Sequence, residues 1–308
     1  MANELLANNF ILLALKMKTL KEKLMENKEK ISNKYEYETY VEKNKEKSAF
    51  AHNLNKKIFE SGIKKEKIKG YCDFCQKEVK LRCDYTAGSL GNINFRESMI
   101  CLKCQLNNRM RAVFGILNTI IKEKNEKLDL FCYEQITEFY KKLQKKYKKK
   151  CNLTGSEYIE KDLASGKIIK GIRHENALDL SFQDNSFDII ISNDVYEHVP
   201  DIKKAFKEAY RVLKPSGKLI FTIPFYSNAD KTEARAKFEN DELILLKEKQ
   251  IHGNPMSQEG SLVFYDIGWD VFDFLKEAEF KQSYIIPVWD EKTGNIDYGP
   301  ILIFVAEK

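Results

Sequence analysis

The sequence lacks any run of apolar residues close to the roughly 18 that a membrane-spanning helix needs. The apolar stretch at residues 10–15 is short, and it has neither a basic leader nor a small-residue cleavage site. We therefore expect no signal peptide and no membrane span, and a cytoplasmic protein. A strong charge of one sign is also missing, because the formal net charge is only +6 over 308 residues. Lysine interleaved with glutamate at the N-terminal end is typical of solvated helix faces, so a nucleic-acid partner is possible but not favoured.

Proline is absent from residues 1–69, which predicts a lysine-rich helical extension whose role the sequence does not indicate. Residues 70–108 are rich in cysteine and turn-forming residues, which is typical of a small loop-rich module. Residues 109–125 are predicted to form a connecting helix. Its apolar residues recur at steps of three and four: Val113, Phe114, Leu117, Ile120 and Ile121.

After this helix, short apolar segments alternate with amphipathic ones. Strands are predicted at residues 128–132, 152–158, 168–172, 187–192, 218–224, 285–288 and 301–306, and helices at 135–148, 201–213 and 269–278. This alternation predicts an α/β domain over residues 126–308, with a Rossmann-like, mostly parallel sheet covered by helices on both faces. Residues 226–260 interrupt the pattern with a charged stretch that we expect to be helical. Because ligands of open α/β folds bind beyond the carboxyl ends of strands, this insertion is a candidate lid.

The strongest single motif is a pair of Cys-x-x-Cys sequences, Cys72 with Cys75 and Cys101 with Cys104. Each pair can place two thiolates on one tight turn, and two such turns complete a tetrahedral four-sulfur site for a structural Zn²⁺. Two surface disulfides are the alternative, less favoured without a secretory signal. Four thiolates leave no coordination position for an activated water, so this predicted zinc ion supports folding rather than hydrolysis.

Three segments carry a family resemblance. Residues 171–188 read GIRHENALDLSFQDNSFD, residues 189–201 read IIISNDVYEHVPD, and residues 211–217 read RVLKPSG. Over residues 126–308 the chain resembles the class I S-adenosylmethionine-dependent methyltransferases of the type 11 group. The whole chain also resembles a bacterial group, often found beside surface-glycan enzymes, in which a cysteine-rich ribbon precedes such a domain.

The resemblance implies which residues bind S-adenosylmethionine. Glu134 ends the first strand, and Glu157, after the second strand, would accept hydrogen bonds from the ribose hydroxyls; a surface carboxylate is the alternative for Glu157. Asn176 would accept from the adenine amino group, and Ala177 would offer its backbone N–H to the ring. Asn193 ends a later strand at the mouth of the expected pocket.

Residues at the mouth of the expected pocket and in the inserted segment are candidates for the acceptor side. His198 can act as general base on an acceptor hydroxyl, or it can only order its loop. Glu197 is expected to accept hydrogen bonds from backbone amides rather than to abstract protons. Asp194 and His252 are weaker candidates for contact with the substrate.

The expected function is methyl transfer from S-adenosylmethionine to an oxygen or nitrogen acceptor, plausibly on a sugar, sugar nucleotide or other glycan-related small molecule. One alternative is an RNA-modifying methyltransferase. The other is a non-catalytic binding module. It is motivated by the first-strand segment Leu130–Glu134, which lacks the family's glycines and places Phe131 and Tyr133 where space is needed.

Overall fold

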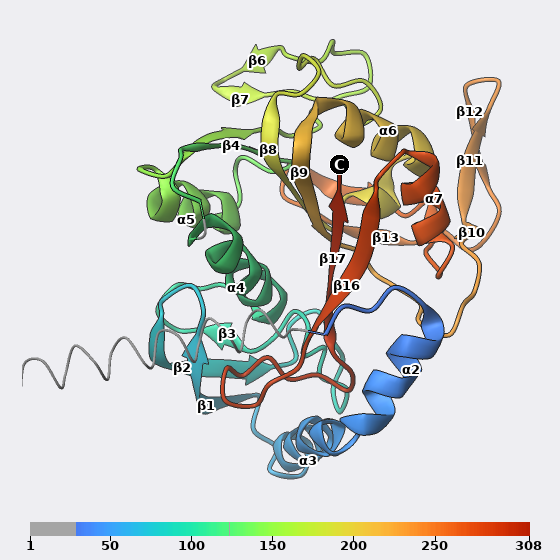
Figure 1. The fold of residues 1–308 in the computed structure, drawn as a ribbon. Helices are drawn as coiled ribbons and strands as arrows, with labels where there is room; N and C mark the ends of the chain where they lie inside the picture. Colours follow the sequence, from blue (N-terminus) through green and yellow to red (C-terminus); the bar gives the residue numbers. More distant parts are fainter. Residues whose placement is uncertain (1–28, 123) are drawn as a thin grey trace, which may run out of the picture. The chain divides into compact units, whose positions relative to one another are not determined.

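A computed structural model describes residues 29–122 and 124–308. The chain divides into two units, residues 1–30 and residues 31–308. A six-stranded sheet lies at the centre of the second unit, in the order β16–β17–β9–β8–β4–β5 (Figure 1). The strands are β4 Leu128–Cys132, β5 Cys151–Gly155, β8 Phe187–Asn193, β9 Leu213–Thr222, β16 Gln282–Val288 and β17 Ile301–Glu307. Strands β9, β8, β4 and β5 run parallel, whereas β17 is antiparallel to both of its neighbours.

Helices cover both faces of this sheet. α4 (Asn108–Lys122) and α5 (Glu138–Tyr147) share one apolar core with β4 and β8. α6 (Ile202–Val212) and α7 (Val271–Glu277) share a second core on the opposite face. The predicted fold class, a mostly parallel α/β sheet between two helix layers, is therefore confirmed.

Local sequence explains why the elements begin and end where they do. The apolar run of β8 is buried on both faces of the sheet, as a continuous hydrophobic strand requires. The Asp201 side chain caps α6 by accepting from the Lys204 amide at 2.9 Å, and Thr137 caps α5 in the same way. Most predicted strands and helices lie within a few residues of their observed positions.

The N-terminal part of this unit holds two helices, α2 (Lys34–Lys43) and α3 (Glu46–Glu60), followed by a three-stranded antiparallel sheet. Its strands are β1 (Lys65–Cys72), β2 (Lys77–Asp84) and β3 (Ile100–Cys101), so the module begins at Lys65 rather than residue 70. The long helices expected over residues 1–69 include residues 1–28, which lie outside the described part of the chain.

The cysteine module is joined to the main sheet by the loop between β16 and β17. Arg111 on α4 is fully buried and donates to the carbonyls of Thr293 and Gly294 at 2.7 and 2.8 Å. The Tyr71 amide of β1 donates to the Lys292 carbonyl in the same loop at 2.8 Å. Hydrogen bonds to main-chain carbonyls of this loop, from the Arg111 side chain and the Tyr71 amide, therefore hold α4 and the module against the sheet.

Two of the predicted secondary-structure elements are wrong. Residues 168–172 do not form a strand of the central sheet. They make a small hairpin, β6 (Ile168–Ile169) with β7 (Ile172–Arg173), because the left-handed conformations of Lys170 and Gly171 turn the chain between them.

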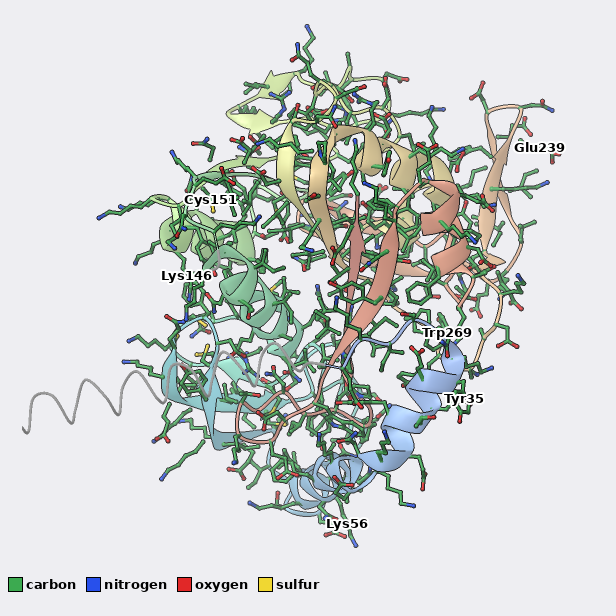
Figure 2. The ribbon with its side chains drawn as sticks, viewed as in Figure 1. Tyr35, Lys56, Lys146, Cys151, Glu239 and Trp269 are labelled. Carbon is green, nitrogen blue, oxygen red and sulfur yellow. The ribbon has the colours of Figure 1, made fainter. Side chains whose placement is uncertain are left out.

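Residues 226–260 are not helical either. They form short strands: β10 (Glu233–Ala234), β11 (Ala236–Glu239), β12 (Glu242–Leu245), β13 (Ile251–Asn254) and β14 (Ser257–Leu262), with β15 (Tyr265–Asp266) pairing to β10. Figure 2 shows Glu239 at the tip of the projecting β11–β12 hairpin. Asn240 and Asp241 adopt positive φ there, so turn geometry overrides the helical charge pattern. Among the described residues, no helix is long and apolar enough to cross a membrane.

Candidate functional site

A cavity of about 1850 Å³ lies at the edge of the sheet where the parallel strands β4, β5 and β8 end. All the residues that we predict to contact the cofactor or the acceptor, and the predicted general base, line this cavity. Parallel strands place their carboxyl ends at one edge, which explains why residues far apart in sequence meet here. Typical ligand pockets occupy about 300–1,000 Å³, so this cavity has room for a nucleoside and an acceptor together.

The aromatic residues of the first-strand segment do not fill the cavity. Phe131 is fully buried, with its ring centroid 4.9 Å from that of Phe182 and 5.4 Å from that of Phe187. Tyr133 borders the cavity, but its ring packs between Phe131 at 4.7 Å and Tyr196 at 5.9 Å. The bulk that replaces the family's glycines is thus absorbed by the core on the α6 side of the sheet.

Glu134 is held at the base of the cavity by two side chains. Its carboxylate accepts hydrogen bonds from the Thr137 hydroxyl and from the Asn193 side-chain amide. Burial raises the pKa of Glu134, against the opposing effect of those two hydrogen bonds. The arrangement joins the ends of β4 and β8, and it brings together two residues that sequence placed on the cofactor side.

Glu157 lines the cavity and also stabilises the backbone next to it. Its Oε1 accepts from the backbone amides of Gln135 and Ile136 at 2.7 and 2.9 Å, so it orders the turn that follows β4. Burial raises the pKa of this carboxyl, and the two amide hydrogen bonds oppose the shift. A surface carboxylate is excluded, because Glu157 is only 7% exposed.

Asn176 and Ala177 form one wall of the cavity. The Asn176 Oδ1 accepts from the Leu178 amide at 3.0 Å, which closes a local turn and fixes the side chain. An amide oxygen has two lone pairs, so this one can still accept a second hydrogen bond from a ligand.

Asp194 is tied to the cysteine module rather than left open for a substrate. Arg96 binds its carboxylate with both terminal nitrogens, at 2.7 and 2.5 Å, and Arg109 lies 3.3 Å away. Burial alone would raise the pKa of Asp194, but the charges of Arg109 and Arg96 outweigh it and hold that pKa below its usual range. Glu97 pairs with both arginines, at 2.7 and 2.8 Å, and completes the network.

Sequence reasoning missed Arg96 and Glu97. Both lie in a loop of the cysteine module, where charged residues usually face solvent, and Arg96 is 98 positions from Asp194. The sequence indicates the helix that bears Arg109, but not the charged partners of that arginine. Only the packing of the module on the sheet reveals this partly buried ion cluster, which borders the cavity.

His198 and His252 face each other across the cavity rim. Their ring centroids are 5.0 Å apart at an interplanar angle of 89°. His198 lies in a single 3-10 turn (Tyr196–His198), and His252 is carried by β13 of the inserted hairpins. Glu197 was expected to accept from backbone amides, and this is wrong: among the described residues, neither carboxylate oxygen has a hydrogen-bond donor, although the side chain is fully buried.

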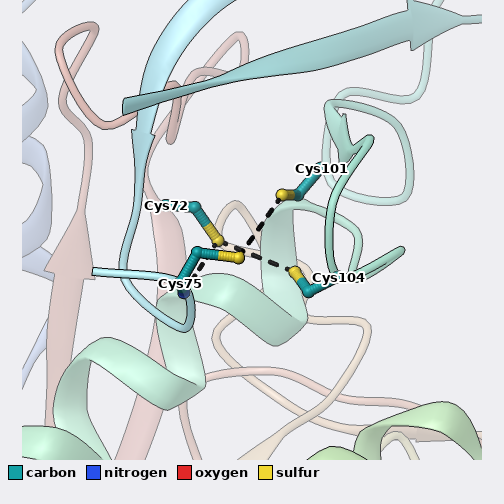
Figure 3. A group of neighbouring side chains, drawn as sticks. All are labelled: Cys72, Cys75, Cys101 and Cys104. Atoms are coloured by element: carbon teal, nitrogen blue, oxygen red, sulfur yellow. Dashed lines mark hydrogen bonds between the residues drawn. The ribbon is translucent and has the colours of Figure 1, made fainter. Parts of the chain in front are cut away.

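The four cysteines of the paired motifs converge on one point (Figure 3). The Sγ atoms of Cys72 and Cys104 are 3.7 Å apart, and those of Cys75 and Cys101 are 3.9 Å apart. A tetrahedral site with Zn–S bonds near 2.3 Å requires S–S separations of about 3.8 Å. The sulfur positions therefore fit a zinc ion.

The two cysteine turns also share one backbone design. The Gln76 amide donates to the Cys72 carbonyl at 2.7 Å, and the Gln105 amide donates to the Cys101 carbonyl at 2.8 Å. Both glutamines adopt positive φ, 53° and 64°. Lys146 of α5, which Figure 2 labels, donates to the carbonyl of Phe74, between Cys72 and Cys75, at 2.7 Å.

Comparison with known proteins bears on the central strands of this site. Residues 132–221 match the family described as Methyltransferase domain. Over this segment the chain is therefore similar to a methyltransferase domain. The segment contains the end of β4, all of β5 and β8 and most of β9, and with them the predicted cofactor residues.

Curated relatives match over a shorter stretch. Phosphoethanolamine N-methyltransferase 2 of Caenorhabditis elegans is 46% identical over 48 residues, 16% of this chain and 11% of the relative. The ubiquinone/menaquinone biosynthesis C-methyltransferase UbiE of Rickettsia prowazekii is 58% identical over 45 residues, 15% of this chain and 18% of the relative. The chain thus spans less than a fifth of either relative.

Solved structures resemble the chain at low identity. An S-adenosylmethionine-dependent methyltransferase of Methanosarcina mazei is 17% identical with a TM-score of 0.38, covering 61% of this chain and 96% of that one. The 1,6-didemethyltoxoflavin N1-methyltransferase of Burkholderia thailandensis, solved with bound 1,6-didemethyltoxoflavin and S-adenosylhomocysteine, is 13% identical with a TM-score of 0.37, covering 65% of this chain and 78% of that one. The order and direction of the strands, rather than these TM-scores, define the fold.

Proposed function

We propose that the protein is an S-adenosylmethionine-dependent methyltransferase. The observation that supports this most directly is the open cavity at the ends of β4, β5 and β8, lined by the residues that sequence assigns to the cofactor. The bound cofactor would supply a sulfonium methyl group that is already reactive, so the protein's part is to hold and orient the reactants.

The residues of the cavity fit this cofactor. Glu157 would accept from the ribose hydroxyls, and Asn176 and Ala177 would contact the adenine. Glu134 and Asn193 would lie beside the methionine part. The buried Oδ1 of Asn193 has no donor among the described residues, so it can accept from a ligand's ammonium group.

On the acceptor side we propose His198 as general base. Nδ1 of His198 lies 2.8 Å from the Leu262 carbonyl, which can only accept, so Nδ1 carries the proton and Nε2 has the free lone pair. His252 would contact the acceptor from the inserted hairpins. We propose that this insertion, residues 226–260, acts as a lid over the cavity. Asp194 would position the acceptor side of the cavity through Arg96.

The acceptor we propose is an oxygen or nitrogen of a sugar or sugar nucleotide, as in the glycan-associated group that the chain resembles. We also propose that the four cysteines hold a structural Zn²⁺, since their spacing fits a four-thiolate site. Reduced thiols of this kind fit a reducing compartment, so the proposed location is the cytoplasm.

Calorimetric titration with S-adenosylmethionine and S-adenosylhomocysteine tests the proposal. Glu157→Ala should weaken binding about 10–100-fold, the value of a hydrogen bond to a charged group. Glu160→Ala, an exposed carboxylate three residues away, is the control and should bind as the wild type does. No heat with either ligand in the wild type would leave only a non-catalytic binding module.

A second experiment addresses the base. His198→Ala should slow methyl transfer while leaving cofactor affinity unchanged. Equal turnover in the variant and the wild type would remove His198 from this role. Binding of RNA that weakens with salt would instead favour the RNA-modifying alternative.

A further inference from the structure

The carboxylate of Glu197 is in an unusual position for a buried acid. Its side chain is fully buried, and no described residue donates a hydrogen bond to either oxygen. Oε1 lies 3.5 Å from Nε2 of His198 and 3.6 Å from Nδ1 of His252. A buried carboxylate without donors is costly, so either a proton or a metal cation must offset its charge among these three groups.

His198 is held by a hydrogen bond from the ring nitrogen that faces away from Glu197. Because Nδ1 donates to the Leu262 carbonyl, Nε2 of the neutral ring presents a lone pair toward Glu197. With the ring neutral, two electron-rich atoms face each other across 3.5 Å, which is the arrangement that a metal cation between them would stabilise. A histidine that donates one ring N–H to a backbone carbonyl while the other nitrogen is free is the usual arrangement of a metal-bound imidazole.

We propose that Glu197, His198 and His252 form a second metal site, for a divalent transition-metal ion such as Zn²⁺. Zn–N and Zn–O bonds of about 2.0–2.2 Å in a tetrahedral site place ligand atoms about 3.3–3.6 Å apart, and both measured separations agree with this. The three ligand atoms all lie within 4.8 Å of one another. Three protein ligands leave a position for a substrate oxygen or water, unlike the four-cysteine site.

The backbone around His252 is built to hold it at this point. His252 pairs with Ser261 across the β13–β14 hairpin, and a Cβ on Gly260 would lie 2.3 Å from the His252 carbonyl oxygen, so this close approach needs glycine. The side-chain amide nitrogen of Gln250 lies 3.3 Å from Nε2 of His252. The oxygen and nitrogen of an amide are assigned from their partners; with the two exchanged, the Gln250 oxygen would accept from Nε2–H while Nδ1 binds the metal.

The ion would join two separate elements. Glu197 and His198 belong to the turn after β8, whereas His252 belongs to the inserted hairpins, and both histidines line the cavity. A bound ion would hold the hairpin against the cavity rim and present its open position to the acceptor. Metal on Nε2 of His198 also excludes that nitrogen as a base, so the metal content of active protein separates the two roles.

The test uses the full chain carrying one equivalent of zinc, titrated with further Zn²⁺ by calorimetry. The wild type should take up a second equivalent. His252→Ala and Glu197→Gln should each lower the affinity for that second ion at least about 10-fold, since even outer partners of metal ligands are worth about 10–100-fold. His52→Ala, which removes an exposed histidine of α3, should bind like the wild type.

Two results would overturn the proposal: no second binding event at a large excess of Zn²⁺, or an unchanged second event in His252→Ala. The hairpin variant guards against misfolding of the buried Glu197→Gln. Titration of the same samples with S-adenosylhomocysteine keeps the two proposals apart. Cofactor binding without a second metal refutes this inference alone, whereas a second metal without cofactor binding refutes the proposed function alone.

Discussion

Replacing Asp194 with asparagine tests whether the cysteine module and the methyltransferase domain are held together by charge. Arg96 binds the Asp194 carboxylate through two contacts of 2.7 and 2.5 Å, and Arg109 adds a third at 3.3 Å. The Arg109 side chain is only 8% exposed. Asp194→Asn keeps the shape and an oxygen for the Thr222 hydroxyl, but it removes the negative charge.

Removing one member of a buried ion pair costs about 3–5 kcal/mol, because the remaining charge is left unpaired. The Arg96 and Asp194 side chains are only partly buried, at 25% and 19% exposed, and Glu97 still neutralises part of the two arginines, so we expect no more than the lower end, about 3 kcal/mol. In a domain of this size each kcal/mol corresponds to about 2–4 °C, which gives a decrease in Tm of about 6–12 °C. Thermal unfolding of zinc-loaded protein at pH 7, followed by circular dichroism, measures it.

The dependence on pH provides a second check. The pKa of Asp194 is lowered in the folded protein, so its stabilisation is present above its unfolded pKa, near 3.8, and is lost as pH falls through the lower folded value. The difference between wild type and Asp194→Asn should therefore be full at pH 5 and above, and shrink below about pH 4.

A matched control is the more exposed pair of Lys34 and Asp230, which lie 2.8 Å apart and whose removal by Asp230→Asn should leave Tm nearly unchanged. Arg96→Met combined with Asp194→Asn should cost less than the sum of the single changes. Equal Tm for wild type and Asp194→Asn, or strict additivity, would refute the reasoning.

Burial and geometry support three more predictions. Cys101→Ser should abolish the tightly bound zinc, measured as metal content, whereas Cys83→Ser, which alters a buried thiol outside the cluster, should retain it. Burial raises the pKa of Asp297 to about 6, so the folded protein becomes less stable as pH rises through 6 and this carboxyl ionises. Asp297→Asn should raise the free energy of unfolding at pH 8 by up to about 3 kcal/mol and have no effect on it below pH 4. Equal thermal melts of the variant and the wild type across this pH range would contradict the prediction. Phe131→Ala should destabilise the fold by about 3–5 kcal/mol yet leave S-adenosylhomocysteine affinity within twofold, and a large gain in affinity would show that the ring occupies ligand space.

Local pattern was enough to predict the elements of the main sheet. The apolar run of β8 and the three- and four-residue spacing of α4 indicate structure by themselves, because each element must bury one face or both. The two Cys-x-x-Cys motifs likewise predicted a four-sulfur cluster, since their ligands come in pairs on tight turns. Pattern failed at residues 226–260, where turn conformations and strand pairing override a helical distribution of charge.

In the candidate site too, the sequence indicated some features and the tertiary structure decided others. The sequence alone determined the residues at strand ends, Glu134, Glu157 and Asn193, because parallel strands must end at a common edge. Only the tertiary structure decided what those residues contact, that Asp194 pairs with Arg96 of the cysteine module, and that His252 meets Glu197 at the cavity rim. These contacts join residues 98 and 55 positions apart, and such pairs depend on how separate elements pack, which no short stretch of sequence encodes.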